Sequence, residues 1–579
     1  MYKKDIIHIL EEIGTLLELK GENPFKARAY FNAARTLETL AADPIPMIKS
    51  GEIADIKGIG SAISGKLKTL VESGQLPYHQ ELKASLPAGL LDLLKIPGLG
   101  PKRVKSIFEK LYISSIGELE YACLENRLRD LDGFGQKSQD NILKSIEMHK
   151  RYSERYHFHF AATEAGHTLE YLQKQPELIR LEIAGSLRRK RETIKDIDIV
   201  ASCPAGHREK VMDYFTRYPQ TERIIAKGAT KSTILLHSGL HCDLRLVDDR
   251  QFPVLLHHST GSKEHNTAMR QRAKSMGLTM NEYGLFPEGK NESLPADDEA
   301  AIFRALGLSD IPPELRENHG EIEAASRQQL PQLVEAGQLR GLFHVHTTYS
   351  DGAAGIKEMA EACRRLGFQF LGISDHSKAA FYANGLNEER VKQQLNEIDQ
   401  LNAQYRDFVI LKGIEVDILA DGALDYADDV LAGFDFVIAS VHSSFKMSEE
   451  DMTRRICRAL ANPYVTMLGH PTGRLLLGRE AYPVNMPVVL ETAAQHGRII
   501  EINANPHRLD LDWRWGKKTR ELGLKTAINP DAHAQDGLND FHLGLGIARK
   551  GWFEAADVIN TMPVDELMDY FRSLREIGQ

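Results

Sequence analysis

The chain has 579 residues, too many for one hydrophobic core, so about three to five domains are expected. Hydrophobic residues make up 42% of the chain and charged residues 26%, as in an ordinary soluble globular protein, and no apolar run is long enough to span a membrane. The net charge is −9, so any binding of nucleic acid would depend on local clusters of basic residues. The five cysteines lack the spacing of zinc or redox sites, which indicates reduced core residues of a cytoplasmic protein.

The first 150 residues are predicted to be helical and to contain one short motif three times. Apolar positions recur at helical spacing over residues 4–18 and 24–42. The motif is an apolar residue, any residue, Gly, an apolar residue and Gly, and it supplies Gly58, Gly60, Gly98, Gly100, Gly133 and Gly135. Two glycines permit a tight turn, and the N–H groups that begin the following helix can hold an anion. One copy fits an ordinary turn, but three copies form the helix-hairpin-helix signature and predict binding to the DNA backbone.

Residues 184–200, AGSLRRKRETIKDIDIV, combine a Gly-Ser turn, a basic run and a strand. Residues two apart in a strand share a face, so Asp196 and Asp198 lie side by side while Ile197 and Ile199 point into a core. Adjacent carboxylates repel unless a cation neutralises them, which suggests a divalent metal. The turn and the arginines offer a triphosphate close backbone approach and positive charge. The alternative is a solvated turn before a strand with an acidic edge.

The segments around this stretch predict an α/β domain with a third carboxylate. A helix is expected near 161–175 and strands near 223–227, 232–237 and 240–247. Taken alone, Asp243 on the last strand is an ordinary surface aspartate. Beside the upstream motif it would complete a site for two metal ions, which clamp the attacking and leaving oxygens of an in-line displacement.

As a set, these motifs resemble the family X DNA polymerases over residues 1–315. The matching motifs are Gly185-Ser186, Arg189, Asp196-x-Asp198, Asp243-x-Arg245, Thr260-Gly261-Ser262 and Asn281-Glu282-Tyr283. The resemblance implies gap-filling synthesis, in which the primer 3′-oxygen attacks the α-phosphorus of a dNTP and pyrophosphate leaves. It implies that Mg²⁺ is bound by Asp196, Asp198 and Asp243. It also implies that the β and γ phosphates are held by Gly185, Ser186 and Arg189.

The resemblance assigns three further residues and shows two departures. Asn266 and Arg270 match thumb positions that contact the nascent base pair. Lys66, which from spacing alone is a solvated helical lysine, aligns with the Schiff-base lysine of the family's 5′-deoxyribose-phosphate lyase. The aromatic pair that crowds the sugar 2′ position is replaced by His258-Ser259, so a weaker bias against ribonucleotides is expected. A second lysine near the lyase position of animal relatives is replaced by Ala62.

Residues 341–579 alternate strands with helices, and polar residues follow successive strands. The helices are expected at 356–366, 387–404, 449–460 and 487–496, after a polar linker at 316–337. Such repeated units describe a barrel whose site lies at the carboxyl ends of its strands. A single histidine there would be structural, but nine ligand-type residues predict bound metal: His344, His346, Asp351, His376, Glu415, His442, His470, Asp531 and His533.

This pattern resembles the PHP (polymerase and histidinol phosphatase) domain over residues 338–579. The resemblance implies three metal sites, formed by His344, His346, Glu415 and Asp531, by Glu415, His442 and His470, and by Asp351, His376 and His533. It implies phosphoester hydrolysis with a metal-activated hydroxide. Because this domain is fused to a polymerase, the expected substrate is a DNA 3′ end and the expected activity is a 3′→5′ exonuclease. Activity as a 3′-phosphatase or an abasic-site endonuclease is compatible with the same site. Mn²⁺ or Zn²⁺ suits such a histidine-rich site, and Fe²⁺ is also compatible.

The expected fold class is multidomain α + α/β. It comprises helical helix-hairpin-helix domains, a nucleotidyltransferase palm with a thumb, and a C-terminal PHP domain with a distorted (β/α)7-type barrel. The expected domains are a lyase-like domain (1–85), fingers with two hairpins (86–150), palm (151–248), thumb (249–315), linker (316–337) and PHP domain (338–579).

The expected protein is a cytoplasmic monomer that binds gapped or nicked DNA and dNTPs but no membrane. It would fill short gaps in base excision repair and trim 3′ ends. One alternative is an end-processing nuclease or phosphatase whose polymerase half is weak or non-catalytic, and the intact triad of Asp196, Asp198 and Asp243 argues against it. The other alternative is a non-enzymatic scaffold that binds DNA ends. The two complete sets of metal-ligand residues make this the least favoured of the three hypotheses.

Overall fold

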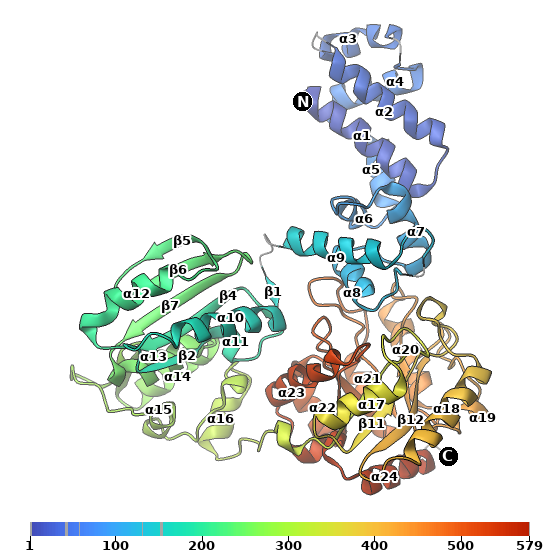
Figure 1. Cartoon of the computed structure of the whole chain (residues 1–579). Helices are drawn as coiled ribbons and strands as arrows, with labels where there is room; N and C mark the ends of the chain where they lie inside the picture. Colours follow the sequence, from blue (N-terminus) through green and yellow to red (C-terminus); the bar gives the residue numbers. More distant parts are fainter. Residues whose placement is uncertain (1–2, 41–43, 57, 130, 151–154, 578–579) are drawn as a thin grey trace. The chain divides into compact units, whose positions relative to one another are not determined.

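The computed structural model describes residues 3–40, 44–56, 58–129, 131–150 and 155–577 (Figure 1). The chain divides into two compact units, Met1–His149 and Lys150–Gln579, and each is described by itself. Lys57 of the first hairpin and the expected domain boundary at residue 151 lie outside the described residues. None of the helices that the structure describes is both long and apolar enough to cross a membrane.

The first unit consists of helices joined by short turns. The α-helices are α1 (Lys3–Lys20), α2 (Pro24–Thr39), α3 (Pro44–Ser50), α4 (Ser61–Ser73), α5 (Pro77–Ala84), α6 (Leu90–Leu93), α7 (Pro101–Leu111), α8 (Ile116–Leu124) and α9 (Gln136–Lys150). The start of α2 follows from its sequence, because the Asn23 side chain accepts a hydrogen bond from the Phe25 N–H and Pro24 fits the first turn. Two apolar cores form, one around α1, α2 and α4 and one around α7, α8 and α9.

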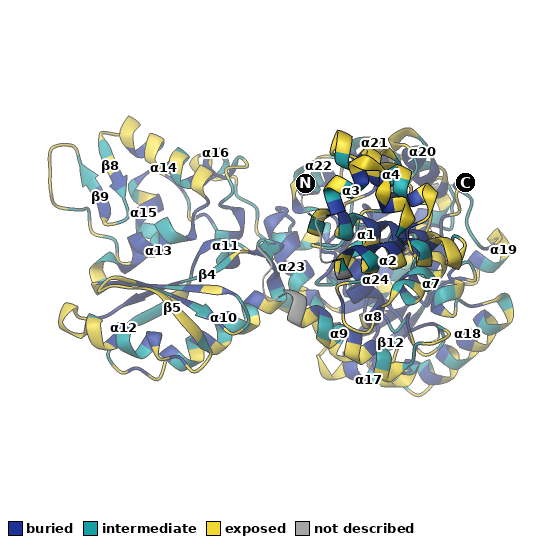
Figure 2. Cartoon of the chain, turned by 90° about the horizontal axis from the view of Figure 1, so that it is seen from above, coloured by how far each residue is buried: buried dark blue, intermediate teal, exposed yellow. Residues whose placement is uncertain are grey.

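The palm is a five-stranded sheet in the order β2-β4-β7-β6-β5. Its strands are β2 (Arg180–Ile183), β4 (Asp196–Ser202), β5 (Thr221–Lys227), β6 (Lys231–Leu236) and β7 (His241–Val247). One face is covered by α10 (Phe158–Leu172) and α12 (Arg208–Thr216), whose apolar side chains meet those of β4 and β7. On the other face α13 (Phe252–Thr260) packs against Val200. The interior strand β4 is largely buried, whereas the edge strand β5 is exposed along nearly its whole length (Figure 2).

The thumb follows the palm and extends into the segment expected to be a linker. It comprises α13, α14 (Lys263–Ser275), the pair β8 (Leu278–Asn281) and β9 (Gly284–Pro287), α15 (Glu299–Ala305) and α16 (Glu321–Ser326). Ile322 and Ala325 of α16 are buried in the thumb core, and the Glu321 carboxylate accepts a hydrogen bond of 2.7 Å from His265. The segment is therefore polar in composition but packed in the structure. Glu321 can be buried because its carboxylate has hydrogen-bond partners.

The remaining residues form a nearly closed barrel of seven parallel strands, β10 to β16 in chain order. The strands are β10 (Gly341–Val345), β11 (Phe370–Ile373), β12 (Val409–Asp417), β13 (Phe436–Ser440), β14 (Met467–Leu468), β15 (Ile499–Asn503) and β16 (Thr526–Asn529). A parallel bridge between Val345 and Ala532 links the first strand to the segment after the last. The connecting helices include α17 (Ile356–Arg365), α18 (Glu388–Asn402), α20 (Glu449–Leu460), α21 (Met486–Gln495) and α23 (Phe541–Lys550).

Aromatic side chains fill the barrel interior away from the histidines. Phe343, Phe370 and Phe436 are fully buried and pack with Phe571 of α24 (Val564–Ile577). The polar side chains that follow the strands lie at the carboxyl end of the barrel. The expected fold class is confirmed: hairpin-bearing helical domains, a palm with a thumb, and a (β/α)7-type barrel.

Candidate metal centres

The three palm aspartates meet because β4 and β7 run parallel in one register. Asp198 lies directly opposite Asp243, with Asp196 one alternate position before it. Ile197 and Ile199 are buried, as the alternation predicts. Burial, with Asp196 and Asp243 nearby, raises the pKa of Asp198 to about 7. The strands thus hold three carboxylates in one place, an arrangement that a divalent cation stabilises.

The turn before β4 approaches this triad closely. Gly185 has φ +62°, and a Cβ built on it would lie 2.0 Å from an oxygen of Asp198. The Ala184 N–H also donates to the Asp198 carbonyl oxygen at 2.8 Å. Only glycine fits here, so the turn that begins at Gly185-Ser186 lies directly against the carboxylates.

The two arginines after the turn have different surroundings. Arg188 is bound by Glu299, with Nη2 2.5 Å from the carboxylate, and Glu299 also binds Arg316. Arg189 donates to the Thr260 carbonyl oxygen, and its Nε lies 3.1 Å from Glu317. The sequence singled out Arg189 but missed Glu299 and Glu317. These acids come from distant segments of the thumb, and no local pattern marks them.

The thumb residues expected at the nascent base pair lie around His258. The Asn266 side-chain N–H group donates to the His258 carbonyl oxygen at 2.8 Å. Nη2 of Arg270 lies 3.4 Å from Nδ1 of His258. Burial and the charge of Arg270 lower the pKa of His258. The structure therefore brings Asn266 and Arg270 together with His258, which stands where the family has an aromatic residue.

The three hairpins of the first unit share one backbone conformation. Their first glycines have positive φ, +107° at Gly58, +91° at Gly98 and +82° at Gly133. In each turn the residue after this glycine donates its N–H to the carbonyl two residues before the glycine, at 3.0, 3.1 and 2.9 Å. Arg103, which the sequence reading missed, donates to the carbonyl oxygens of Gly98 and Gly133 and so joins the second and third hairpins.

Lys66 lies on α4 in a partly buried aromatic setting. Its Nζ donates to the Tyr30 hydroxyl and lies 3.7 Å from the centre of the Tyr78 ring. Burial and the nearby Lys26 lower the pKa of Lys66. A lowered pKa makes the neutral, nucleophilic amine more accessible. The sequence alone indicated a solvated lysine, and the partners differ because helix packing brings Tyr30 and Tyr78 to it.

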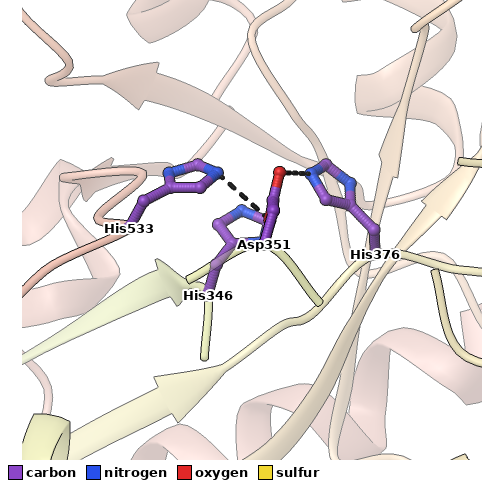
Figure 3. A group of neighbouring side chains, drawn as sticks. All are labelled: His346, Asp351, His376 and His533. Atoms are coloured by element: carbon purple, nitrogen blue, oxygen red, sulfur yellow. Dashed lines mark ion pairs between the residues drawn. The ribbon is translucent and has the colours of Figure 1, made fainter. Parts of the chain in front are cut away.

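All nine ligand-type residues of the barrel lie at one end of it. Figure 3 shows His346, Asp351, His376 and His533, whose ligand atoms lie within 4.8 Å of one another. The imidazoles of His344 and His346 lie 3.5 and 3.2 Å from Asp531. Glu415 is central, with one oxygen 3.2 Å from His442 and 3.0 Å from His470. The ligand atoms of His344, Glu415 and His470 lie within 4.8 Å of one another, and so do those of His376, Glu415 and His442. The expected site of Glu415, His442 and His470 is therefore divided, with His470 beside His344 and His442 beside His376.

Several buried nitrogen and oxygen atoms of these residues are suited to bind a metal ion. Both ring nitrogens of His346 and of His376, and one oxygen of Glu415, make no hydrogen bond of good geometry in the part of the chain that the structure describes, although His376 Nδ1 lies 2.9 Å from that Glu415 oxygen. A buried imidazole or carboxylate without such a bond is costly, and coordination of a cation removes the cost. Histidine nitrogens mixed with carboxylate oxygens suit Mn²⁺, Fe²⁺ or Zn²⁺.

A second layer of acids, which the sequence reading did not select, orients the histidines. Glu501 is fully buried and lies 2.5 Å from Nδ1 of His344, and its other oxygen accepts the main-chain N–H of His470. Asp417 lies 3.0 Å from Nδ1 of His442. Such contacts fix ring orientation and tautomer in metal sites. Asp375, by contrast, accepts from Thr347 and serves the loop after β10.

Comparison with known proteins covers the whole chain. The matching family models are a helix-hairpin-helix domain (residues 1–76), a SAM-like helix-hairpin-helix tandem (90–147), the DNA polymerase beta thumb (255–317) and the PHP domain (343–504). The chain is 40% identical over 574 residues to the DNA polymerase/3′-5′ exonuclease PolX of Bacillus subtilis (strain 168), a match covering 99% of this chain and 100% of that protein.

A shorter relative is a protein of Thermoanaerobacter sp. (strain X514) named Probable phosphatase. It is 31% identical over 250 residues, which cover 41% of this chain and 96% of that protein. The expected family resemblance is confirmed by the full-length match and by the thumb, hairpin and PHP models. The chain belongs to the family of the bacterial DNA polymerase/3′-5′ exonuclease PolX.

Proposed function

We propose that this chain is a DNA-directed DNA polymerase that fills short gaps in base excision repair and shortens DNA from the 3′ end with its barrel. The observation that carries the proposal is the pairing of Asp198 with Asp243 across adjacent strands, directly against the Gly185 turn. The full-length relative is named for both activities. Divalent metal use follows from both parts, with Mg²⁺ proposed at the triad and Mn²⁺ or Zn²⁺ at the barrel.

In the palm the chain's own groups bind and orient the substrates. Asp196, Asp198 and Asp243 would hold the metal ions, which when bound neutralise charge on the attacking and leaving oxygens. Gly185, Ser186 and Arg189 would hold the β and γ phosphates, where charge accumulates. Asn266 and Arg270 would contact the base pair beside His258.

In the barrel the nine ligands would hold the hydrolytic metals, whose chemistry is activation of water for attack on a phosphoester. Glu501 and Asp417 orient the imidazoles of His344 and His442. Action on 3′-phosphates and abasic sites belongs to the proposal, and the phosphatase-named relative supports it.

The DNA would be held by the three hairpins, whose glycines at positions 58, 60, 98, 100, 133 and 135 allow phosphates to approach the backbone. We propose that a monomer in the cytoplasm binds gapped or nicked DNA and dNTPs. The proposed domain limits are residues 1–85, 86–150, 151–248, 249–315 and 338–579, and within the intervening residues 316–337 helix α16 packs in the thumb core.

The central test is primer extension and degradation on gapped DNA with single variants of the full chain. Asp196→Ala should abolish extension and keep degradation, and His344→Ala should do the reverse. Asp213→Ala is the matched control, because Asp213 lies on α12 and pairs with Lys227. Extension that survives in Asp196→Ala would overturn the polymerase assignment.

Lyase action is proposed at Lys66, because its pKa is lowered and Tyr30 holds its amine. Borohydride should trap the wild type, but not Lys66→Ala, on DNA with a 5′-deoxyribose phosphate. Lys68→Ala, on the same helix and paired with Glu72, is the control. Equal trapping of Lys66→Ala would remove this assignment.

A further inference from the structure

The end of helix α23, which belongs to the barrel, makes a buried contact with the palm. Its last residue, Lys550, has a fully buried side chain. The ammonium group donates to the carbonyl oxygens of Arg189 at 3.1 Å and Glu314 at 3.2 Å, and lies 2.6 Å from the Glu317 carboxylate. On the barrel side it lies 4.7 Å from the centre of the Trp513 ring. A buried ammonium persists only with such a set of partners.

Glu317 carries this contact on to the nucleotide turn. The oxygen that receives Lys550 also accepts from Nε of Arg189 at 3.1 Å, and the other oxygen lies 3.6 Å from Arg191. The carboxylate is itself 8% exposed, so water screens these charges little. Lys550 therefore holds Arg189 twice, at its carbonyl oxygen directly and at its guanidinium through Glu317.

The same contacts leave one nitrogen of Arg189 available. Nε is bound to Glu317, and Nη1 donates to the Thr260 carbonyl oxygen. Nη2 has no hydrogen-bond partner among the residues that the structure describes. A guanidinium fixed at two nitrogens loses little conformational freedom when the third binds an anion.

We propose that Lys550 is a positioning residue for the polymerase reaction: the barrel fixes Glu317 and the main chain of Arg189, and thereby directs the free guanidinium nitrogen at the triphosphate. This inference rests on the proposed role of Arg189 in phosphate binding. It makes the barrel a structural part of the nucleotide site, in addition to its own hydrolytic centre.

The test uses the full chain, single-nucleotide gapped DNA and dTTP opposite dA. Lys550→Met removes the charge at similar length and should raise the KM for dTTP about tenfold, with kcat within about twofold. Glu317→Gln, which keeps the shape of the carboxylate, should act in the same direction and serves if Lys550→Met folds poorly. Degradation of a 3′ end should be unchanged in both. Arg549→Met is the matched control, because Arg549 is the preceding residue and binds Glu314 in the same interface.

A double variant separates positioning from general loosening. Because Lys550 acts through Arg189, Lys550→Met should add nothing to the KM of Arg189→Ala. A wild-type KM in both Lys550→Met and Glu317→Gln, or an equal rise in Arg549→Met, overturns the inference. If Arg189→Ala itself leaves the KM unchanged, the proposed phosphate role fails first. If only Arg189→Ala raises the KM, the proposed function stands and the inference alone fails.

Discussion

Glu501 shows how one buried carboxylate can set the affinity of the barrel for metal. It lies 2.5 Å from Nδ1 of His344 and accepts a hydrogen bond from the main-chain N–H of His470. Glu501→Gln should weaken Mn²⁺ binding about 10- to 100-fold, because the His344 ring loses its orienting charge. Calorimetric titration of the metal-stripped protein measures this change. Glu491→Gln, an exposed position on α21, is the control, and unchanged affinity in Glu501→Gln would contradict the role.

His258 offers a test of sugar selection at the scale of one side chain. Its ring faces Arg270 at 3.4 Å, where the family's aromatic pair would crowd the 2′ position. We therefore expect kcat/KM for dNTPs and rNTPs to be comparable, and the preference for dNTPs to rise when His258→Tyr is combined with Ser259→Phe. Single-turnover insertion with dTTP and UTP opposite dA measures the ratio. A wild-type preference of about a thousandfold or more would show that another group excludes the ribose hydroxyl.

Lys550 gives a pH dependence of stability whose sign can be derived. Burial lowers its pKa to about 8, although Glu317 opposes the shift. The unfolded chain keeps this proton up to about pH 10.4. Between these values the unfolded state binds more protons, so this group makes the free energy of unfolding rise with pH, by on the order of 3 kcal/mol at most.

Lys550→Met should lack that rise. Thermal unfolding of both proteins from pH 7 to pH 10 provides the comparison, with Arg549→Met as control because it changes the preceding residue of the same helix and keeps Lys550. A pH profile of Lys550→Met that parallels the wild type would show that Lys550 does not release its proton on folding.

At the scale of elements, the hairpins allow backbone strain to be separated from side-chain crowding. A Cβ at Gly98 or at Gly100 would meet no atom within 4 Å, but Gly98 has φ +91° and Gly100 has φ −96°. Gly98→Ala should therefore lower the free energy of unfolding by about 1–2 kcal/mol, and Gly100→Ala should cost less. Urea unfolding of the two variants decides the point. Equal losses would mean that the positive φ is not what glycine supplies at position 98.

The elements also show where prediction from sequence succeeds and where it fails. The clustering of Asp196 with Asp198, and of the nine ligand-type residues at one end of the barrel, could be predicted because period-two alternation and strand ends are local signals. Glu501 could not be, because it reaches His344 only when the sheet curls and brings β10 next to β16. The polar composition of residues 316–337 predicts a linker, but Glu321 in this segment is buried because it pairs with His265 from a distant helix, a partner that no local signal marks.

At the scale of the molecule, the two candidate metal centres belong to one compact unit, residues 150–579. The palm and the barrel that carry them touch through Lys550 at Arg189 and through His157, whose ring nitrogen lies 2.9 Å from the Leu476 carbonyl oxygen. The barrel therefore has a double role in the proposed function: it hydrolyses the 3′ end and supports the nucleotide turn.

Metal removal and return should assign the ions to these centres. A ligand that binds only the folded state adds about 2.7 kcal/mol to stability at 100 times its Kd. Mn²⁺ should therefore raise the Tm of the chelator-treated wild type and of Asp196→Ala, because both keep the nine ligand-type residues of the barrel. His344→Ala should lose most of the rise, since it removes a ligand that lies 3.2 Å from Glu415 and 3.5 Å from Asp531. A full rise in His344→Ala would place the stabilising ions outside the barrel, and a loss in Asp196→Ala would place them at the palm.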